Sequence, residues 1–214
     1  MLDMSSIDDP ASAHVERLRG GDHEALADLF DVCRVRLRRI AVFRIDSRLR
    51  GRFDADDVLQ EAYLAAEARL SHFIDTPMLT GFLWLRLVLG QTLIDLHRRH
   101  LGAHKRDARR EVGLQGPPGS ANTSLSIAAV LAADITSPSR VAMRAENLSR
   151  VQAALETMNP VDREVLALRH FEELSNKEVA DVLEVQEKAA SIRYVRALKR
   201  LKEILSEVSG SSPS

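Results

Sequence analysis

The sequence NPVDREVLALRHFEELSNKEVADVLEVQEKAASIRYVRALKRLKEIL, residues 159–205, contains the start signals of three consecutive helices. Asn159 can cap a helix, and Pro160 suits the first helical position. Ser175 and Glu178 have the spacing of a capping box, in which each side chain accepts a hydrogen bond from the backbone N–H of the other residue. A third helix can start only three residues after the second one ends. This stretch therefore predicts three helices joined by short connections.

Each of these predicted helices has one apolar face. The apolar residues recur at intervals of three and four, which brings their side chains onto the same side of a helix. The three faces consist of Val161, Val165, Leu168 and Phe171; of Val179, Ala180, Val182 and Leu183; and of Ala190, Tyr194, Ala197, Leu201, Ile204 and Leu205. Such a short connection between the second and third helices fits a helix-turn-helix.

Positive charge is concentrated on the third predicted helix. Within ten residues that contain no acid lie Arg193, Arg196, Lys199, Arg200 and Lys202. A helix with such a face suits the major groove of DNA. The alternative is a solvated cationic face on an ordinary three-helix bundle. Together with the capping box and the short turn, the charge favours DNA recognition.

The composition is that of a small globular protein whose charges are segregated. The chain is 45% hydrophobic and 29% charged, and its 30 basic and 31 acidic residues nearly cancel. Residues 86–110 carry seven Lys or Arg against two acids, whereas acidic residues gather at 54–61. Two basic segments and one acidic segment predict contacts with both DNA and a protein partner.

Several protein classes are disfavoured by the sequence. Cys33 is the only cysteine, which excludes an internal disulfide and a four-cysteine zinc site, and we expect it in the core. The N-terminus MLDMSSIDDP is polar and acidic, unlike a signal peptide, and Arg86 interrupts the longest apolar run. We therefore expect a cytoplasmic protein without membrane insertion.

A linker separates two helical halves. Residues 113–126, GLQGPPGSANTSLS, hold three Gly, two Pro and four Ser or Thr and show no periodicity. The apolar segment at 127–133 fits either a short helix or a piece that docks on a partner. No strand signal is present, so we predict an all-α fold of two small helical domains, the C-terminal one a helix-turn-helix.

In the N-terminal half, apolar periodicity predicts further helices. They are expected at about 14–20, from Asp22 onward with that residue as the cap, at about 55–70 and at about 80–100. Trp84, in the last of these, is expected in the core.

With the pieces in this order, the chain resembles the extracytoplasmic-function class of bacterial sigma factors over roughly residues 11–110 and 145–205. Three segments carry the resemblance: DADDVLQEAYLAA at 54–66, WLRLVLGQTLIDLHRRH at 84–100, and LRHFEELSNKEVADVLEVQEKAASIRYVRALKRL at 168–201. They are similar to the family's polymerase-clamp, promoter-melting and promoter-reading segments, in that order.

The resemblance implies a function and a division of the chain. A region 2-like domain at 11–110 would dock on core RNA polymerase and melt the minus-ten element of the promoter. A linker would follow at 111–144, and a region 4-like domain at 145–207 would bind the minus-thirty-five element. The implied partners are core RNA polymerase, promoter DNA and an anti-sigma factor.

The resemblance also implies which residues bind polymerase and DNA, namely those at positions that match the family's motifs. Asp57, Gln60 and Glu61 share one helical face, which could present acceptors to a basic coiled coil of the polymerase or could be an ordinary solvated acidic face. The expected polymerase-binding residues are Asp54, Asp57, Gln60 and Glu61. The expected DNA-binding residues are Lys188, Ser191, Ile192, Arg193, Val195, Arg196 and Lys199 on the promoter-reading helix, and Asp95, Arg98, Arg99, His100, Lys105 and Arg106 in the melting segment.

The chain also departs from the family pattern. Many members have Gly in the helix-turn-helix turn where this chain has Glu184, and a left-handed non-Gly residue costs about 1 kcal/mol. Ala189 and Ala190 replace the usual Thr-Val, which removes a hydroxyl that could contact phosphate. Base preference is therefore not carried over.

The sequence also leaves two other functions open. A stand-alone helix-turn-helix regulator would bind DNA without polymerase. A metal site could use His97, His100 and His104 on one helical face, but the surrounding Arg and Lys disfavour a cation. Because no acid–base pair, nucleophile motif or phosphate-binding glycine loop is present, we expect no enzyme activity, no metal and no cofactor.

Overall fold

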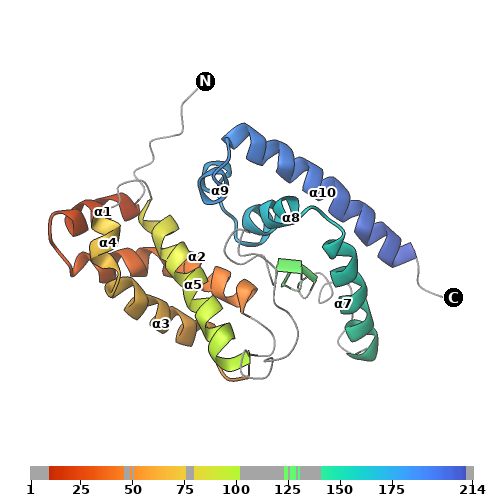
Figure 1. Cartoon of the computed structure of the whole chain (residues 1–214), viewed down its shortest axis with the longest axis horizontal. Coiled ribbons are helices and arrows are strands. Elements are labelled where there is room, and N and C mark those ends of the chain that lie inside the picture. Colours follow the sequence, from red (N-terminus) through yellow and green to blue (C-terminus); the bar gives the residue numbers. More distant parts are fainter. Residues whose placement is uncertain are drawn as a thin grey trace. The chain divides into compact units, whose positions relative to one another are not determined.

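The computed structural model describes residues 10–45, 49, 51–75, 80–101, 123–124, 126–128, 130 and 141–210. Within these residues every regular element is a helix, which confirms the predicted all-α fold (Figure 1). The chain divides into two compact units, Met1–Ala108 and Arg109–Ser214. None of the helices in the described part combines the length and apolar character that a membrane span requires.

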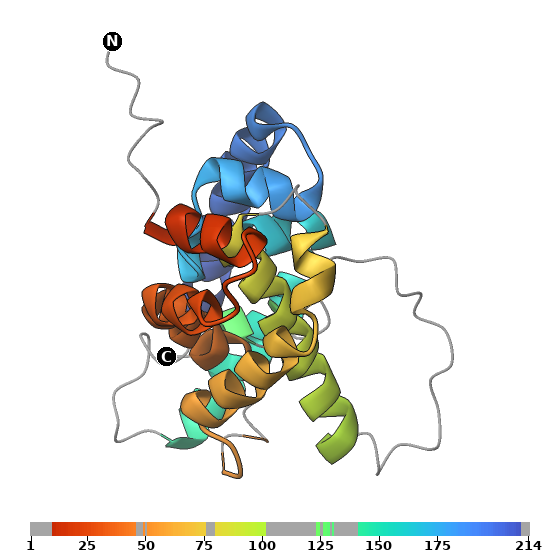
Figure 2. The same cartoon turned by 90° about the vertical axis from the view of Figure 1, so that its left-hand side faces the viewer.

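The N-terminal unit packs its helices around α2 and α5. Its elements are α1 (Pro10–Arg19), α2 (Ala25–Arg44), α3 (Ala55–Glu67), α4 (Leu70–Ile74) and α5 (Gly81–Leu101). Helix α3 contacts both α2 and α5, and lies beside α5 in both views (Figure 2). Cys33 is buried, and the Trp84 ring stacks on Phe73 with centroids 4.2 Å apart. The core positions expected for Cys33 and Trp84 are therefore confirmed.

The predicted cap of α2 was wrong by two residues, because the N-cap position is occupied by Glu24 rather than Asp22. Asp22 does not cap this helix, which begins at Ala25. Its carboxylate instead accepts a hydrogen bond from the Glu24 N–H at 3.1 Å and pairs with Arg17 at 2.7 Å. The Ala25 N–H donates to the Asp22 carbonyl oxygen at 3.2 Å, so residues 22–25 form a turn and the α-helix starts only at Ala25. The other bounds also shift: α1 already begins at Pro10, and α3 ends at Glu67.

The C-terminal unit contains the predicted helix-turn-helix. Its elements are α7 (Val141–Glu156), α8 (Pro160–Leu166), the π-helical turn η3 (Ala167–Phe171), α9 (Asn176–Leu183) and α10 (Glu187–Gly210). The Asn159 side chain accepts a hydrogen bond from the Val161 N–H at 2.9 Å, as expected of a cap. The capping box is confirmed as well, because the Glu178 N–H donates to Ser175 Oγ at 3.1 Å and the Ser175 N–H donates to Glu178 Oε2 at 2.7 Å.

The turn between α9 and α10 holds Glu184 in the left-handed conformation. Its backbone angles are φ 53° and ψ 43°, in the region that favours glycine. The Glu184 N–H donates to the carbonyl oxygen of Asp181 at 3.4 Å, and the next N–H, that of Val185, donates to Ala180 at 3.0 Å. The turn thus keeps helical C-cap bonding although it lacks the glycine of the family pattern.

We expect the substitution Glu184→Gly to raise the free energy of unfolding of the C-terminal unit by about 1 kcal/mol, because it removes the left-handed strain. Ala153→Gly is the matched control, since Ala153 lies on the exposed side of α7 and should lose about 1 kcal/mol there. Urea unfolding followed by circular dichroism measures both. A Glu184→Gly protein as destabilised as the control would contradict the assigned conformation.

Part of the expected linker is helical and packed. The described residues 123–124, 126–128 and 130 are helical, and Thr123, Ile127 and Ala128 are at most 1% exposed. The Thr123 hydroxyl donates to the buried carboxylate of Glu164 on α8 at 2.6 Å. Of the two alternatives for the apolar segment at 127–133, its described residues thus favour the short helix. Residues 141–144, which were also expected to be linker, form the start of α7, and the other linker residues lie outside the described part of the chain.

Candidate protein and nucleic-acid interfaces

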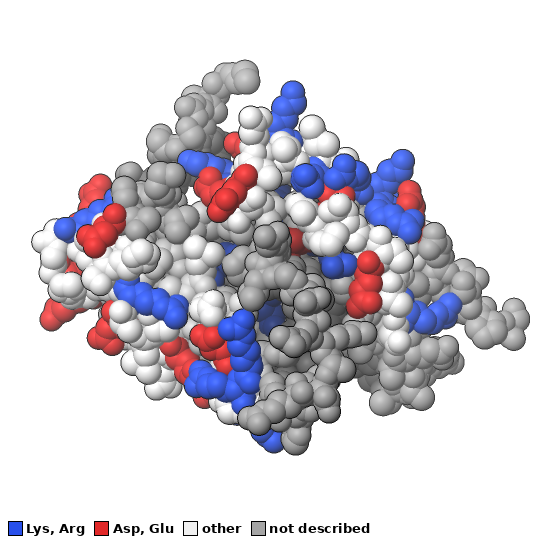
Figure 3. Space-filling model, in the orientation of Figure 1, with Lys and Arg blue, Asp and Glu red and all other residues white. Residues whose placement is uncertain are grey.

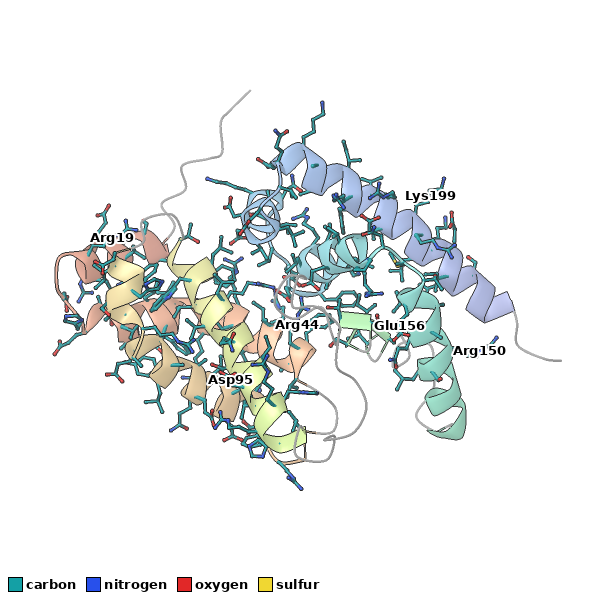
Figure 4. All side chains as sticks on the ribbon, viewed as in Figure 1. Arg19, Arg44, Asp95, Arg150, Glu156 and Lys199 are labelled. Carbon is teal, nitrogen blue, oxygen red and sulfur yellow. The ribbon has the colours of Figure 1, made fainter. Side chains whose placement is uncertain are left out.

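Helix α10 has one anchored side and one exposed side. Ala190, Ala197 and Ile204 are fully buried and fix the helix to its neighbours α7, α8 and α9. The opposite side presents four exposed residues at i, i+4, i+7 and i+11, which we call the outer ridge. The outer ridge consists of Lys188, Ile192, Val195 and Lys199. Lys199 points away from α8 in Figure 4.

Two arginines predicted to bind DNA already have a partner inside the protein. Arg196 donates from Nε and Nη2 to the two carboxylate oxygens of Asp162, at 2.7 and 2.6 Å. Arg193 lies 3.5 Å from the same carboxylate. Hydrogen bonding to Asp162 raises the pKa of the Arg196 guanidinium. Asp162, which is only 6% exposed, therefore ties α10 to the first turn of α8.

Cationic side chains recur along the surface that α10 forms (Figure 3). Acidic side chains lie among them, and Glu203 pairs with Arg200 at 3.1 Å. Ser191 is exposed beside the outer ridge. The structure thus places the predicted promoter-reading residues on one helix but divides them: Arg193 and Arg196 bind Asp162, although the Arg196 side chain is still 57% exposed, whereas the outer ridge and Ser191 lie away from Asp162 and face solvent.

Two acidic residues at the start of α3 cap this helix. The Asp54 carboxylate accepts hydrogen bonds from the N–H groups of Asp56 and Asp57, at 2.8 and 2.9 Å. The Asp57 carboxylate in turn accepts a hydrogen bond from the Asp54 N–H at 2.9 Å. Asp54 and Asp57, both predicted to bind polymerase, therefore form a capping box and are held in place by it.

The acidic docking face, defined by Asp54, Asp57, Gln60 and Glu61, is extended by an apolar residue that the sequence analysis missed. Leu64 is 56% exposed and follows Gln60 by one helical turn. Its apolar character suggests burial, but its spacing of four residues from Gln60 lies outside the apolar stripe of α3, so helical periodicity could have indicated its exposure. Its exposure beside polar acceptors is typical of a protein interface.

A cavity of about 420 Å³ opens between α2 and α3 next to this face. Its walls include Phe30 and Tyr63, whose rings meet edge to face with centroids 5.3 Å apart. Asp56 also lines it, and hydrogen bonds from Arg34 and Arg38 lower the pKa of that carboxyl group. The cavity thus joins an aromatic wall to a charged rim, in which Asp56 is paired with Arg34.

The acidic docking face meets the basic end of α5 through one ion pair. Arg99 donates to Glu61 Oε2 at 2.6 Å, with both side chains partly exposed. The two residues had been assigned to different partners, Glu61 to polymerase and Arg99 to DNA. In the free protein their charges neutralise each other. The two residues are 38 positions apart in the sequence, so local sequence patterns could not predict this contact.

The other predicted melting residues have mixed surroundings. Arg98 is exposed, the His100 ring lies 4.8 Å from that of Phe53, and Asp95 accepts a hydrogen bond from Gln91 at 3.0 Å. Asp95 lies on α5 in Figure 4. Lys105 and Arg106 lie outside the described residues.

The metal alternative gains no support from the described residues. His97 and His100 lie on α5, but His104 lies outside the described part. Among the residues that the structure describes, no three His, Cys, Asp or Glu side chains are placed to hold a metal ion together.

Comparisons with known proteins agree with the helix-turn-helix assignment. The family described as Sigma-70, region 4, matches residues 148–201. The ECF RNA polymerase sigma factor SigD of Mycobacterium tuberculosis is 29% identical over 184 residues, covering 86% of this chain and 78% of that protein. SigW of Bacillus subtilis, another protein of that description, is 22% identical over 196 residues, covering 91% and 96%.

A solved structure shows a similar fold. The structure of CnrH in complex with the cytosolic domain of CnrY aligns with a TM-score of 0.51 at 24% identity, covering 95% of this chain and 99% of that one. This likeness concerns the fold alone.

Proposed function

Because the chain belongs to the extracytoplasmic-function class of the sigma-70 family, we propose that it directs core RNA polymerase to a two-element promoter. The C-terminal unit binds the minus-thirty-five element, and the N-terminal unit docks on polymerase and separates the strands of the minus-ten element. We assign these roles to the domains proposed from the sequence, 11–110 and 145–207. The role is regulatory rather than enzymatic.

The observation that carries this proposal is the helix-turn-helix with its exposed cationic helix. The capped α9 and the short turn present α10, whose outer ridge has a lysine at each end. A helix presented in this way can enter the major groove while its lysines neutralise phosphates. The overlap of this element with the region 4 match at 148–201 supports assigning it to the upstream promoter element.

Polymerase docking is assigned to α3. The capping box holds Asp54 and Asp57 at the start of the helix, Gln60 and Glu61 follow one turn later, and Leu64 adds apolar area. Charge complementarity with a basic coiled coil would speed association and set the orientation, while Leu64 would be buried on binding. An anti-sigma factor that competes with polymerase is the remaining proposed partner.

Strand separation is assigned to the basic end of α5. Holding an unpaired base outside the stack costs a few kcal/mol, which stacking and phosphate contacts must offset. Arg98, Arg99 and His100 supply cationic and aromatic groups there, and Asp95 lies one turn earlier. Because Arg99 is paired with Glu61 in the free protein, its release to a phosphate would accompany docking.

Sequencing the DNA that the protein retains, with and without purified core polymerase, tests the proposal. Each DNA-binding unit is small, so the two units should hold promoter DNA firmly only when polymerase joins them. We expect stable association with polymerase and enrichment of a two-element motif only in its presence. Specific retention of DNA without polymerase association would instead favour the stand-alone regulator.

A further inference from the structure

Two aliphatic side chains occupy the middle of the outer ridge. Ile192 and Val195 are 58% and 65% exposed and lie one helical turn apart. Lys188 lies one turn before Ile192, and Lys199 lies one turn after Val195. No described residue of the C-terminal unit covers these two side chains, although apolar groups of this size are normally buried.

The dimensions of the outer ridge match those of the major groove. Lys188 and Lys199 are about 16 Å apart along the helix axis, given a rise of about 1.5 Å per residue. The major groove is about 12 Å wide. Two lysines at this separation reach phosphates on opposite walls of the groove, which brings Ile192 and Val195 against the base edges between them.

The two arginines nearest the outer ridge are paired with an acidic residue of the protein. Arg196 and Arg193 both bind Asp162, on the side of α10 that faces α8. Ser191 remains as the exposed hydroxyl beside the two aliphatic side chains. The centre of the reading surface is therefore apolar, and it suits base edges that carry an apolar group.

Thymine is the base that presents such a group in the major groove, its C5-methyl. We propose that Ile192 and Val195 contact thymine methyl groups in the upstream element, so that thymines determine much of the sequence preference of this protein. Charge complementarity supports DNA as the occupant, because both flanking residues are lysines that attract phosphate. The inference rests on the proposed function, since it takes α10 to be the promoter-reading helix.

Replacing thymine by deoxyuridine tests this directly, because the substitution removes the methyl group and keeps the base pair. The full-length protein, assembled with core polymerase, is titrated with the enriched promoter duplex in which each upstream thymine is replaced in turn. At one or two positions we expect the dissociation constant to rise about three- to fourfold, the effect of re-exposing one methyl-sized group.

The protein variants Ile192→Ala and Val195→Ala complete a double-mutant cycle. Each variant should bind the thymine duplex more weakly and should lose its response to deoxyuridine at one position. Val35→Ala is the matched control: Val35 is 73% exposed on α2 of the other unit, and its truncation should leave the deoxyuridine response intact.

The outcomes separate the two proposals. An upstream element without thymine, a dissociation constant that deoxyuridine leaves unchanged, or an unchanged response in both alanine variants would overturn the thymine contacts while leaving the sigma-factor function standing. Failure of the protein to retain DNA with polymerase would overturn the proposed function itself.

Discussion

Replacing Glu61 with lysine is expected to weaken association with core RNA polymerase at least about tenfold, the scale of reversing a charge inside a complementary interface. The substitution reverses the charge at the centre of the acidic docking face. It also places a lysine opposite Arg99, where Glu61 now pairs at 2.6 Å. The fold should survive, because a partly exposed pair of this kind contributes about 1 kcal/mol or less to stability.

The measurement is an equilibrium titration of labelled protein with purified core polymerase in the absence of DNA. Glu16→Lys is the matched control, because Glu16 is an exposed glutamate on α1, outside the acidic docking face. It should bind as the unchanged protein does. An equal affinity for all three proteins, with intact helicity, would refute the assignment of α3 as the docking helix.

Replacing Lys199 with glutamate is expected to weaken binding of the assembled holoenzyme to promoter DNA at least about fivefold near 0.15 M salt. This is the affinity that one lysine–phosphate contact contributes by releasing counterions from the DNA. The slope of log K against log salt should fall by about one. Because phosphate contacts carry no sequence information, all promoter variants should lose affinity by a similar factor.

Arg150→Glu provides the same charge change on α7, away from the outer ridge (Figure 4). It should leave the salt slope unchanged. If Arg150→Glu and Lys199→Glu reduce affinity equally, the effect is one of net charge and the outer ridge does not face DNA.

Local signals in the sequence predicted the helix-turn-helix well, because capping involves residues close together in the chain. Asn159, Ser175 and Glu178 make the predicted bonds. Glu184, which stands where the family pattern has Gly, adopts the left-handed conformation. The start of α2 was wrong because a turn over residues 22–25 precedes the helix, and within it the Asp22 carboxylate accepts the Glu24 N–H. Capping preference alone does not distinguish such a turn from the first turn of an α-helix.

The candidate sites were harder to predict, because their geometry depends on contacts between distant residues. Asp162 binds Arg196 across 34 positions. The exposure of Leu64 and Ile192 depends on which face of each helix its neighbours cover, although the spacing of Leu64 from Gln60 already placed it on the polar face of α3. The sequence could therefore indicate which segments bind, but not which side chains of those segments are already engaged.

Single-round transcription by purified core polymerase, on a linear duplex that carries the retained promoter, tests the central claim most directly. The account predicts a run-off transcript from one start site only when the protein and core polymerase are both present. Absence of that transcript under conditions where the protein binds the duplex, or an equal transcript from core polymerase alone, would contradict the assignment of this chain as the promoter-specificity subunit.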